Sequence, residues 1–387
     1  MTRRRLLLGL LALLLIAAIG FFAIAPGYVE GSMNKVVATR LPTVTPATRA
    51  LHARLAIADL HADTLLWRRS LLDKASRGQV DLPRLQAGNV ALQIFSSVTK
   101  TPKGQNYQSN GADSDNITAL AIAQLQPPRT WSSLLQRSLY HAEKLRSAEA
   151  GSQGHLRIVR TGADVRRLLA DRAAGQKVTG AMLSIEGLQN LEGKLENVAR
   201  LHQAGFRMAG IAHFFDNEVG GSMHGVAKGG LTPFGRQVIR EMEGRGMIVD
   251  IAHASPAAVA DILAMARRPV VSSHGGVQAT CKVNRNLSDA QIRAVAATGG
   301  LIGIGYWDGA VCDTSPSAIA AAIAHVRAVA GIDHVALGSD FDGAVTTGFD
   351  TAGLVNVTQA LVDRGFTPDE IAAVMGGNLL RFLSQLP

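Results

Sequence analysis

The sequence predicts a closed (β/α)8 barrel of the TIM type, preceded by an N-terminal membrane segment. Eight short apolar runs follow one another between residues 56 and 339, and helical patterns separate most of them. The runs are continuous and do not alternate in polarity, which is typical of parallel strands buried on both faces. Five of the runs end in a histidine or a carboxylate. Because the carboxyl ends of barrel strands meet at one face, we expect these residues to share one pocket.

The N-terminus is suited to a membrane. Three arginines, Arg3 to Arg5, precede an apolar run from Leu6 to Ala25. At about 1.5 Å per residue this run spans a bilayer core of roughly 30 Å. We interpret residues 1–26 as an uncleaved signal anchor with the catalytic domain exported to the periplasmic or extracellular side. A cleaved signal peptide is the alternative, although Pro26 is a poor residue after a cleavage site, and a buried core helix is less favoured.

Residues 27–47 are rich in Gly, Pro, Thr and Ser and show no sustained period, so we predict a tether there and one folded domain over residues 48–387. Predicted strands cover residues 56–62, 90–96, 180–185, 207–212, 247–252, 269–273, 299–304 and 334–339. Predicted helices cover residues 132–150, 163–174, 195–204, 233–245, 256–266, 289–298, 317–330 and 368–374. The long segment 99–179 is expected to cap or line the mouth of the pocket.

An open, doubly wound sheet is the structural alternative. It would need a phosphate-binding glycine fingerprint, and the glycine-rich stretch from Gly220 to Gly230 has no such form, so we interpret it as a flexible loop.

Charge and cysteine content exclude some functions. The formal net charge is +9, but three of these charges are the N-terminal arginines and the rest are spread along the chain, so nucleic-acid binding is not indicated. Cys281 and Cys312 are too few for a disulfide scaffold and lack CxxC spacing. In an exported domain they either pair or remain two separate buried thiols.

The strand-end residues form a ligand set for two metal ions. His61 and Asp63 are two residues apart on one strand, point to the same side, and suit a first ion. His253 and His274 end later strands and suit a second ion. Glu186 ends a strand between the two pairs in chain order and is the expected bridge, because paired ions roughly 3.5–4 Å apart need a shared carboxylate.

Three further residues complete the expected site. Asp340 follows the last strand and is the favoured general acid/base, whereas an Asx-turn role suits Asp342 better. His213 is placed to polarise a carbonyl or stabilise an oxyanion, and Arg285 is placed to clamp a substrate carboxylate. For both residues a structural role is the open alternative. The remaining histidines are left out of the site: His52, His141, His155, His202, His224, His325 and His334.

These residues resemble the membrane dipeptidase (renal dipeptidase) family of zinc peptidases, within the metal-dependent amidohydrolase-like barrels. The similarity extends over roughly residues 55–383, in the order of the family's motifs. The matching stretches are Asp59-Leu60-His61-Ala62-Asp63-Thr64, Val80–Leu85, Ser184-Ile185-Glu186-Gly187, Gly230–Gly235, Val249–Ser255, Ser272-Ser273-His274, Arg285-Asn286, Gly338-Ser339-Asp340-Phe341-Asp342-Gly343 and Gly377–Arg381.

The resemblance implies one zinc ion on His61 and Asp63, a second on His253 and His274, and Glu186 between them. It also implies that Asp340 handles the proton, His213 contacts the scissile peptide and Arg285 holds the terminal carboxylate. Cys281 matches a cysteine that animal members use in a disulfide, which favours a Cys281–Cys312 bond. The animal enzymes have Asn at the position of Ala62 and Ser at the position of Ala252. These differences put the substrate preference in doubt, but they remove no metal ligand.

The sequence therefore predicts a membrane-anchored zinc dipeptidase in which a metal-bridging hydroxide attacks the peptide bond, with Glu186 counted among the catalytic residues. Substrates with a C-terminal D-residue are included in this expectation. The alternative is a binuclear amidohydrolase acting on a lactam, lactone or other amide, and a catalytically silent binding protein is a third class. Expected partners are dipeptides, the inner membrane through the N-terminal helix, and a second copy of the chain in a homodimer, but not nucleic acid.

Overall fold

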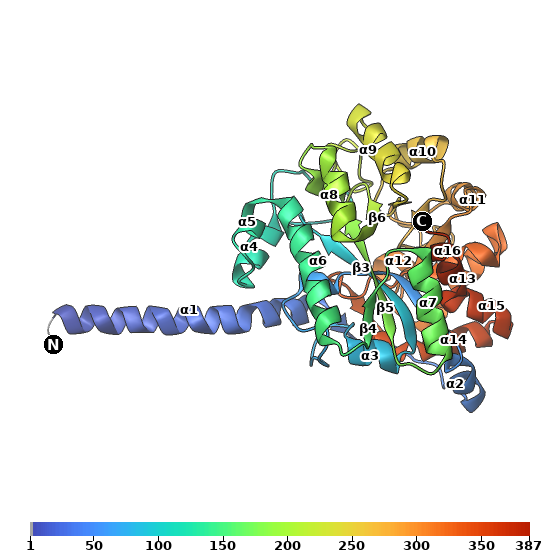
Figure 1. Ribbon diagram of the computed structural model, residues 1–387, viewed down its shortest axis with the longest axis horizontal. Coiled ribbons are helices and arrows are strands. Elements are labelled where there is room, and N and C mark those ends of the chain that lie inside the picture. Colours follow the sequence, from blue (N-terminus) through green and yellow to red (C-terminus); the bar gives the residue numbers. More distant parts are fainter. Residues whose placement is uncertain (1–2) are drawn as a thin grey trace.

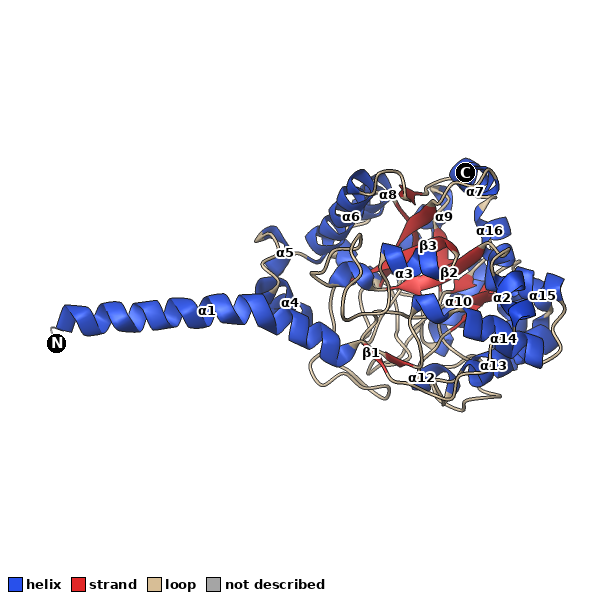
Figure 2. Ribbon diagram, turned by 90° about the horizontal axis from the view of Figure 1, so that it is seen from below, coloured by secondary structure: helices blue, strands red, loops and turns tan. Residues whose placement is uncertain are grey.

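Eight parallel strands close into a barrel in the computed structural model, which describes residues 3–387 (Figure 1). The order around the barrel is β2-β3-β5-β6-β7-β8-β9-β10, and β10 pairs with β2 through Leu337 and Asp59. Figure 2 shows these strands at the centre with helices around them. The predicted barrel is therefore confirmed. Residues 1 and 2 of the expected anchor lie outside the described residues.

All eight predicted strands form. Their bounds are β2 Ile57–Ala62, β3 Val90–Val98, β5 Thr179–Glu186, β6 Phe206–Gly210, β7 Ile248–Asp250, β8 Val271–Ser272, β9 Leu301–Ile304 and β10 Val335–Leu337. A short strand that the sequence analysis did not predict, β4 (Leu156–Ile158), pairs with the first residues of β5. Three residues are too few to show a recognisable pattern.

The predicted helices also form, with ends that shift by one or two residues in most cases. They are α6 Leu134–Gly151, α7 Gly162–Ala173, α8 Glu196–Ala204, α9 Pro233–Gly244, α10 Pro256–Met265, α11 Asp289–Ala297, α13 Pro316–Ala330 and α15 Pro368–Ala372. Four of them start with the same pair of signals, an N-cap Ser or Thr followed by Pro at the first helical position. Helices that we did not predict are α2 Pro46–His52, α3 Leu82–Ala87, α4 Asn116–Ala123, α5 Arg129–Ser132, α12 Asp308–Val311, α14 Val355–Asp363 and α16 Asn378–Leu383.

A buried apolar cluster fills the interior of the barrel. It combines strand residues such as Leu60, Leu92 and Met182 with Leu379 and Leu383 of α16. A larger apolar layer lies between the strands and the surrounding helices. The polar strand-end residues lie outside the interior cluster, at the end of the barrel formed by the carboxyl ends of the strands.

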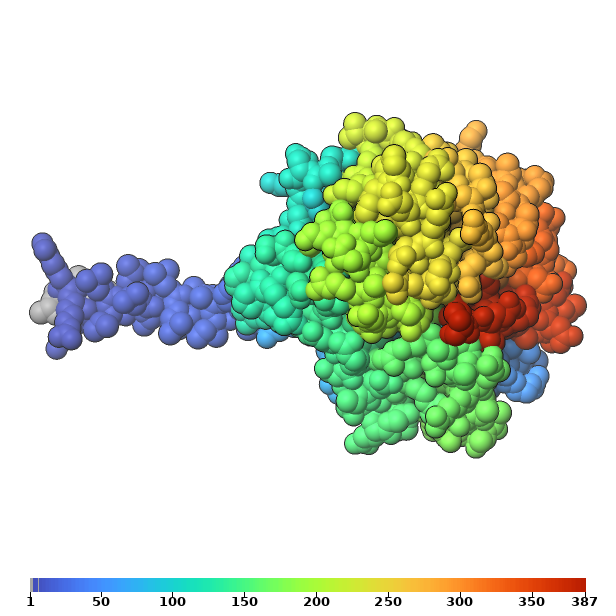
Figure 3. Space-filling view, turned by 45° about the horizontal axis from the view of Figure 1, so that its top comes forward, coloured from blue at the N-terminus to red at the C-terminus, as the bar shows by residue number. Residues whose placement is uncertain are grey.

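The N-terminal helix is longer than expected. Helix α1 runs from Arg3 to Met33, so the first residues of the predicted tether are helical, and α1 projects from the barrel as a rod (Figure 3). By length and composition it is suited to span a membrane, a property shared by anchors and signal sequences. The sequence suggests a flexible linker at Gly27. In the structure Arg77 packs against this glycine so closely that an added Cβ would lie 3.1 Å from Arg77 Cζ.

The rest of the expected tether also contacts the barrel. Strand β1 (Lys35–Val36) pairs in parallel with β11 (Thr346–Thr347), close to the end of β10. Thr45 then caps α2 by accepting a hydrogen bond from the Thr48 backbone. Residues 37–45, between β1 and α2, lack regular structure.

The 99–179 segment divides into two parts. Residues from Thr101 to Leu120 contribute to the pocket mouth, as predicted, and include Tyr107 and Asn116. Helices α6 and α7 instead pack on the outside of the barrel, where their apolar faces cover β3, β4 and β5. The glycine-rich loop is folded around Asp216, whose carboxylate accepts hydrogen bonds from the backbones of Ser222 and Ala227.

Candidate metal centre and active site

Glu186 lies at the centre of a cluster of histidines. It is the last residue of β5, and its Oε1 atom is 2.8 Å from His253 Nε2, 3.2 Å from His274 Nε2 and 3.5 Å from His213 Nε2. Its Oε2 atom is 3.6 Å from His61 Nε2. One carboxylate therefore reaches imidazoles from four different strand ends.

The first strand brings two more oxygens to the cluster. His61 Nε2 lies 3.5 Å from Asp63 Oδ1 and 3.8 Å from Asp340 Oδ1. Asp63 is held beside the β10 end because its backbone N–H donates to the carbonyl of Phe341 at 2.9 Å. The structure thus places all five expected metal ligands, together with Asp340 and His213, around one point.

Three overlapping groups in this cluster have the geometry to hold a cation. They are His61, Glu186 and His274; Glu186, His213 and His253; and His61, Asp63 and Asp340, with ligand atoms within 4.8 Å of one another in each group. Both Glu186 and His61 belong to two groups. We expected His213 only to contact substrate. Its Nε2 atom lies as close to the Glu186 carboxylate as that of His61, an expected metal ligand.

Several buried atoms of the cluster have no hydrogen-bond partner. They include both ring nitrogens of His61, Asp63 Oδ1 and Glu186 Oε2. Leaving buried polar atoms without partners costs on the order of 1–3 kcal/mol each, so native structures rarely contain several together. Imidazole nitrogen and carboxylate oxygen are the ligand atoms that zinc takes in proteins, so these unpartnered atoms fit a metal site.

The charges of the cluster also fit a cation. Burial lowers the pKa values of His253 and His274 well below the ordinary histidine value, with help from the positive charges of Arg285 and, at His274, of His61, so both rings are neutral and free to bind a cation. Burial alone would raise the pKa of Glu186, but His213 and His61 outweigh it and hold that pKa well below its usual value. Glu186 is therefore a carboxylate.

Asp340 behaves differently from Glu186. Burial and the neighbouring carboxylates of Asp63 and Glu186 raise the pKa of Asp340 well above its usual range, although His61 acts in the opposite direction. A carboxyl group with a raised pKa holds its proton more readily than an ordinary carboxyl group, which suits a general acid/base.

Two site residues have left-handed backbones. His253 has φ of 63° and Asp340 has φ of 59°. Residues other than glycine rarely adopt this conformation, and it is concentrated at functional sites where the surrounding structure enforces it. Both residues come three positions after a strand ends, and from this turn His253 reaches Glu186 and Asp340 reaches His61.

A second layer of residues orients the ligands. Ser273 Oγ lies 2.8 Å from His274 Nδ1 and donates to Asp250 Oδ2 at 2.5 Å, which fixes the His274 ring with Nε2 toward Glu186. Asp59 accepts hydrogen bonds from the His61 backbone and from Ser339, joining the ends of β2 and β10. Such outer contacts set ring orientation and ligand basicity.

Arg285 is buried, and two of its nitrogen atoms have no hydrogen-bond partner. Its Nη1 atom lies 3.0 Å from His253 Nδ1, its guanidinium stacks over Trp307 at 4.8 Å, and its Nε and Nη2 atoms have no partner. Trp307 is held in turn by Tyr107, whose hydroxyl accepts from the indole N–H at 3.0 Å. The guanidinium therefore stands next to the histidine cluster with two donors available.

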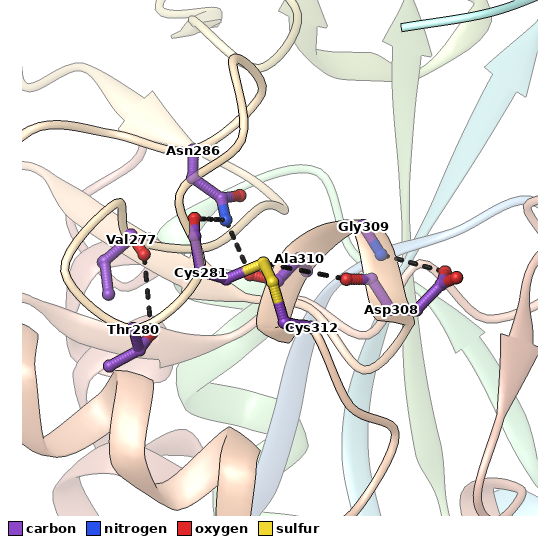
Figure 4. Close-up of a disulfide and its surroundings, with 8 residues drawn as sticks. All are labelled: Val277, Thr280, Cys281, Asn286, Asp308, Gly309, Ala310 and Cys312. Carbon is purple, nitrogen blue, oxygen red and sulfur yellow. Dashed lines mark hydrogen bonds between the residues drawn. A yellow bond between two sulfur atoms is a disulfide. The ribbon is translucent and has the colours of Figure 1, made fainter.

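A disulfide joins the Arg285 loop to the segment after β9. Cys281 and Cys312 are bonded, with their Cα atoms 5.3 Å apart (Figure 4). Beside it, Asn286 Nδ2 donates to the carbonyls of Cys281 and Ala310, each at 2.8 Å. Arg285 thus lies between two cross-links to one neighbouring segment.

The cluster forms the floor of a cavity of about 390 Å³, which Asp63, Glu186, His213, His253 and Asp340 line. His61 and His274 are more deeply buried behind them.

The sequence analysis missed several residues around this cavity. Val29 and Met33 of α1 line it. His224 packs on Phe214 and His253 with ring centroids 4.7 and 5.3 Å away. The sequence favoured an Asx-turn role for Asp342, but in the structure its buried carboxylate binds Arg69 and accepts a hydrogen bond from Thr64. No local pattern marked these residues, since their partners are distant in sequence.

Comparison with known proteins identifies the family. The family model for membrane dipeptidase, peptidase family M19, matches residues 46–386. The chain is 27% identical over 355 residues to Dipeptidase aclJ of Aspergillus oryzae, covering 86% of this chain and 78% of that protein. It is 29% identical over 320 residues to Dipeptidase tcpJ of Claviceps purpurea, covering 80% and 69% respectively.

Solved structures share the fold. A metallopeptidase from Rhodobacter sphaeroides, solved with a phosphinate mimic of the dipeptide L-Ala-D-Ala, superposes with a TM-score of 0.70 at 21% identity, covering 86% of this chain and 99% of that one. The probable dipeptidase PvdM from Pseudomonas aeruginosa superposes with a TM-score of 0.73 at 20% identity, covering 88% and 97%. With its barrel, its metal-capable cluster and the match of the family model, the chain belongs to the membrane dipeptidase family M19 and is a metallo-dipeptidase.

Proposed function

We propose that the protein hydrolyses dipeptides, including those with a C-terminal D-residue, at a pair of zinc ions bridged by Glu186. His61 and Asp63 would hold one ion, and His253 and His274 the other. The observation that carries this proposal is the position of Glu186, whose two oxygens reach histidines of both pairs. Bound there, a zinc pair would lower the pKa of water and so supply a hydroxide nucleophile for the peptide carbonyl.

The chain's own residues then bind the substrate and move the proton. Arg285 would hold the terminal carboxylate through its free Nε and Nη2 donors, which fixes the peptide bond above Glu186. His213 would donate to the developing oxyanion from its place beside Glu186. Asp340 would accept a proton from the attacking group and pass it to the leaving amine.

Turnover of a dipeptide panel tests this proposal. The full chain in detergent, loaded with zinc, should hydrolyse L,L and L,D dipeptides, and a chelator should abolish the activity until zinc is restored. Metal analysis should find two zinc ions per chain. If no member of the panel is hydrolysed by protein that contains both ions, the dipeptidase proposal is wrong.

Arg285 separates a dipeptidase from an amidohydrolase that takes lactams or lactones. A charge-assisted hydrogen bond is worth about 1.5–3 kcal/mol, so Arg285→Ala should raise KM for a dipeptide at least about tenfold. KM for a neutral lactone should change little. Equal effects on both substrates would contradict the carboxylate-binding role.

We further propose that α1 remains as a membrane anchor and that the barrel is exported. Glu30 is fixed in the barrel and lies five residues after Ala25, so the barrel would begin about 7.5 Å beyond the apolar run. The Cys281–Cys312 bond fits an oxidising compartment. Protease added outside the cytoplasmic membrane of expressing cells should digest the barrel, and light scattering of the purified protein tests the expected homodimer.

A further inference from the structure

The last turns of α1 form part of the wall of the active-site cavity. Val29 and Met33 line the same cavity as Asp63, Glu186 and Asp340. Val29 also packs against a small apolar cluster whose members all line this cavity, namely Leu66, Trp67, Val98 and Ile117. A helix suited to a membrane therefore contributes apolar surface to the site of catalysis.

A buried ion-pair network fixes this wall. Glu30, between Val29 and Gly31, is 1% exposed and accepts from Arg69 Nε at 2.5 Å and from Arg77 Nε at 2.8 Å. Arg69 also binds the carboxylate of Asp342, two residues after Asp340. The helix is thus tied to the loop that carries the expected general acid/base.

Two more contacts hold the helix on either side of Glu30. Pro26 has no N–H, so the carbonyl of Phe22 lacks its helical donor, and Arg68 Nη1 donates to it at 2.7 Å. After the helix, Asn34 Oδ1 accepts from the backbone of Ala344 at 2.8 Å, and Ala344 also lines the cavity. These contacts give Val29 and Met33 fixed positions.

The placement indicates which part of a dipeptide meets this wall. Arg285, the expected carboxylate holder, follows β8 and contacts His253, which follows β7. Val29 packs against Leu66 after β2 and Val98 at the end of β3, and these two strands lie across the ring from β7 and β8. A dipeptide held by its carboxylate at Arg285 and by its peptide bond above Glu186 would extend its amino-terminal residue toward the other side. The surface there is apolar.

We propose that Val29 and Met33 determine specificity by selecting dipeptides with a large apolar side chain on the amino-terminal residue. The inference rests on the proposed dipeptidase function. It assigns to the N-terminal helix a part in substrate binding in addition to any anchoring. It also means that a barrel without residues 26–36 would lack one wall of its pocket.

The test compares kcat/KM for Leu-Ala, Ala-Leu and Ala-Ala in the full chain in detergent. Val29→Phe adds an aromatic ring to the wall and should lower kcat/KM for Leu-Ala at least about tenfold, with Ala-Leu and Ala-Ala within about twofold. Ser32→Phe adds the same ring at an exposed position of the same helix and is the matched control. Val29→Ala and Arg77→Gln perturb the wall mildly and should each reduce the preference for Leu-Ala over Ala-Ala.

The outcomes separate the two proposals. If wild-type protein cleaves dipeptides but folded Val29→Phe and Val29→Ala keep its selectivity, or Ser32→Phe shifts selectivity equally, the inference is wrong and the dipeptidase function stands. An equal loss for Ala-Leu and Leu-Ala overturns the assignment to the amino-terminal residue. If wild-type protein with both zinc ions cleaves no dipeptide, the proposed function fails first.

Discussion

Removing the Cys281–Cys312 disulfide should lower both the stability of the barrel and its affinity for substrate. The bond closes a loop with a sequence separation of 31 residues. In the chain-entropy model, opening a loop of that size costs about 3.7 kcal/mol of stability at 25 °C. The barrel matched by the family model spans residues 46–386, for which the unfolding entropy is about 0.7 kcal/mol per kelvin. The double variant Cys281→Ser/Cys312→Ser should therefore melt about 5 °C lower than wild type.

The same variant should bind substrate less well. Arg285 lies between Cys281 and the Asn286 contacts that join its loop to Ala310. Without the covalent link we expect KM for a dipeptide to rise several-fold while kcat changes less, because Arg285 binds the substrate and the cluster around Glu186 is untouched.

Thermal melting and steady-state kinetics of the full chain in detergent measure both effects. Cys281 and Cys312 are the two cysteines of the chain, so their disulfide is the bond that a reductant would break. Cys312 is exposed, so the reductant can reach it. Reduced wild type should match the double variant, and the variant should not respond to reductant. A melting shift below about 1 °C, or an equal response of the variant to reductant, would refute the reasoning.

Three further predictions follow from buried groups. Ser273→Ala removes the hydroxyl that orients His274 and should weaken zinc binding about 10- to 100-fold, measured by competition with a chelator. Asp342→Asn removes one of the two buried carboxylates that bind Arg69, the other being Glu30, and should cost about 1.5–3 kcal/mol, whereas Asp333→Asn, in an exposed pair, should cost less than about 1 kcal/mol by thermal melting. Burial, with Lys144 and Arg137, lowers the pKa of His141 from 6.5 to about 3, so its contribution to stability is complete above pH 6.5 and is lost as the pH falls toward 3. At pH 5 the loss is about 2 kcal/mol relative to neutral pH. His141→Gln should remove a loss of about that size from the pH dependence of the free energy of unfolding, and an unchanged dependence would contradict a buried neutral His141.

Local pattern in the sequence was enough to predict the barrel and most of the polar residues that the structure gathers at one end of it. Each strand is a largely apolar run, and each expected ligand lies within three residues of the end of a strand: Glu186 is the last residue of β5, and His274 comes two residues after β8. The closed ring then brings those ends together whatever their separation in the chain. The Ser-Pro and Thr-Pro signals likewise set the starts of four helices without help from distant residues.

Only the tertiary structure decided the role of residues 27–36 and the full composition of the site. In sequence Gly27 and Gly31 suggest a linker and Glu30 is an isolated charge, yet Arg69 and Arg77 bind Glu30 and place Val29 in the active-site cavity. The closeness of His213 to Glu186, and the opposite pKa shifts of Glu186 and Asp340, also depend on neighbours from other strands. An apolar pattern reports the secondary structure that a segment forms by itself. Burial and charge pairing depend on which segments meet, and that is determined when the chain closes into the barrel.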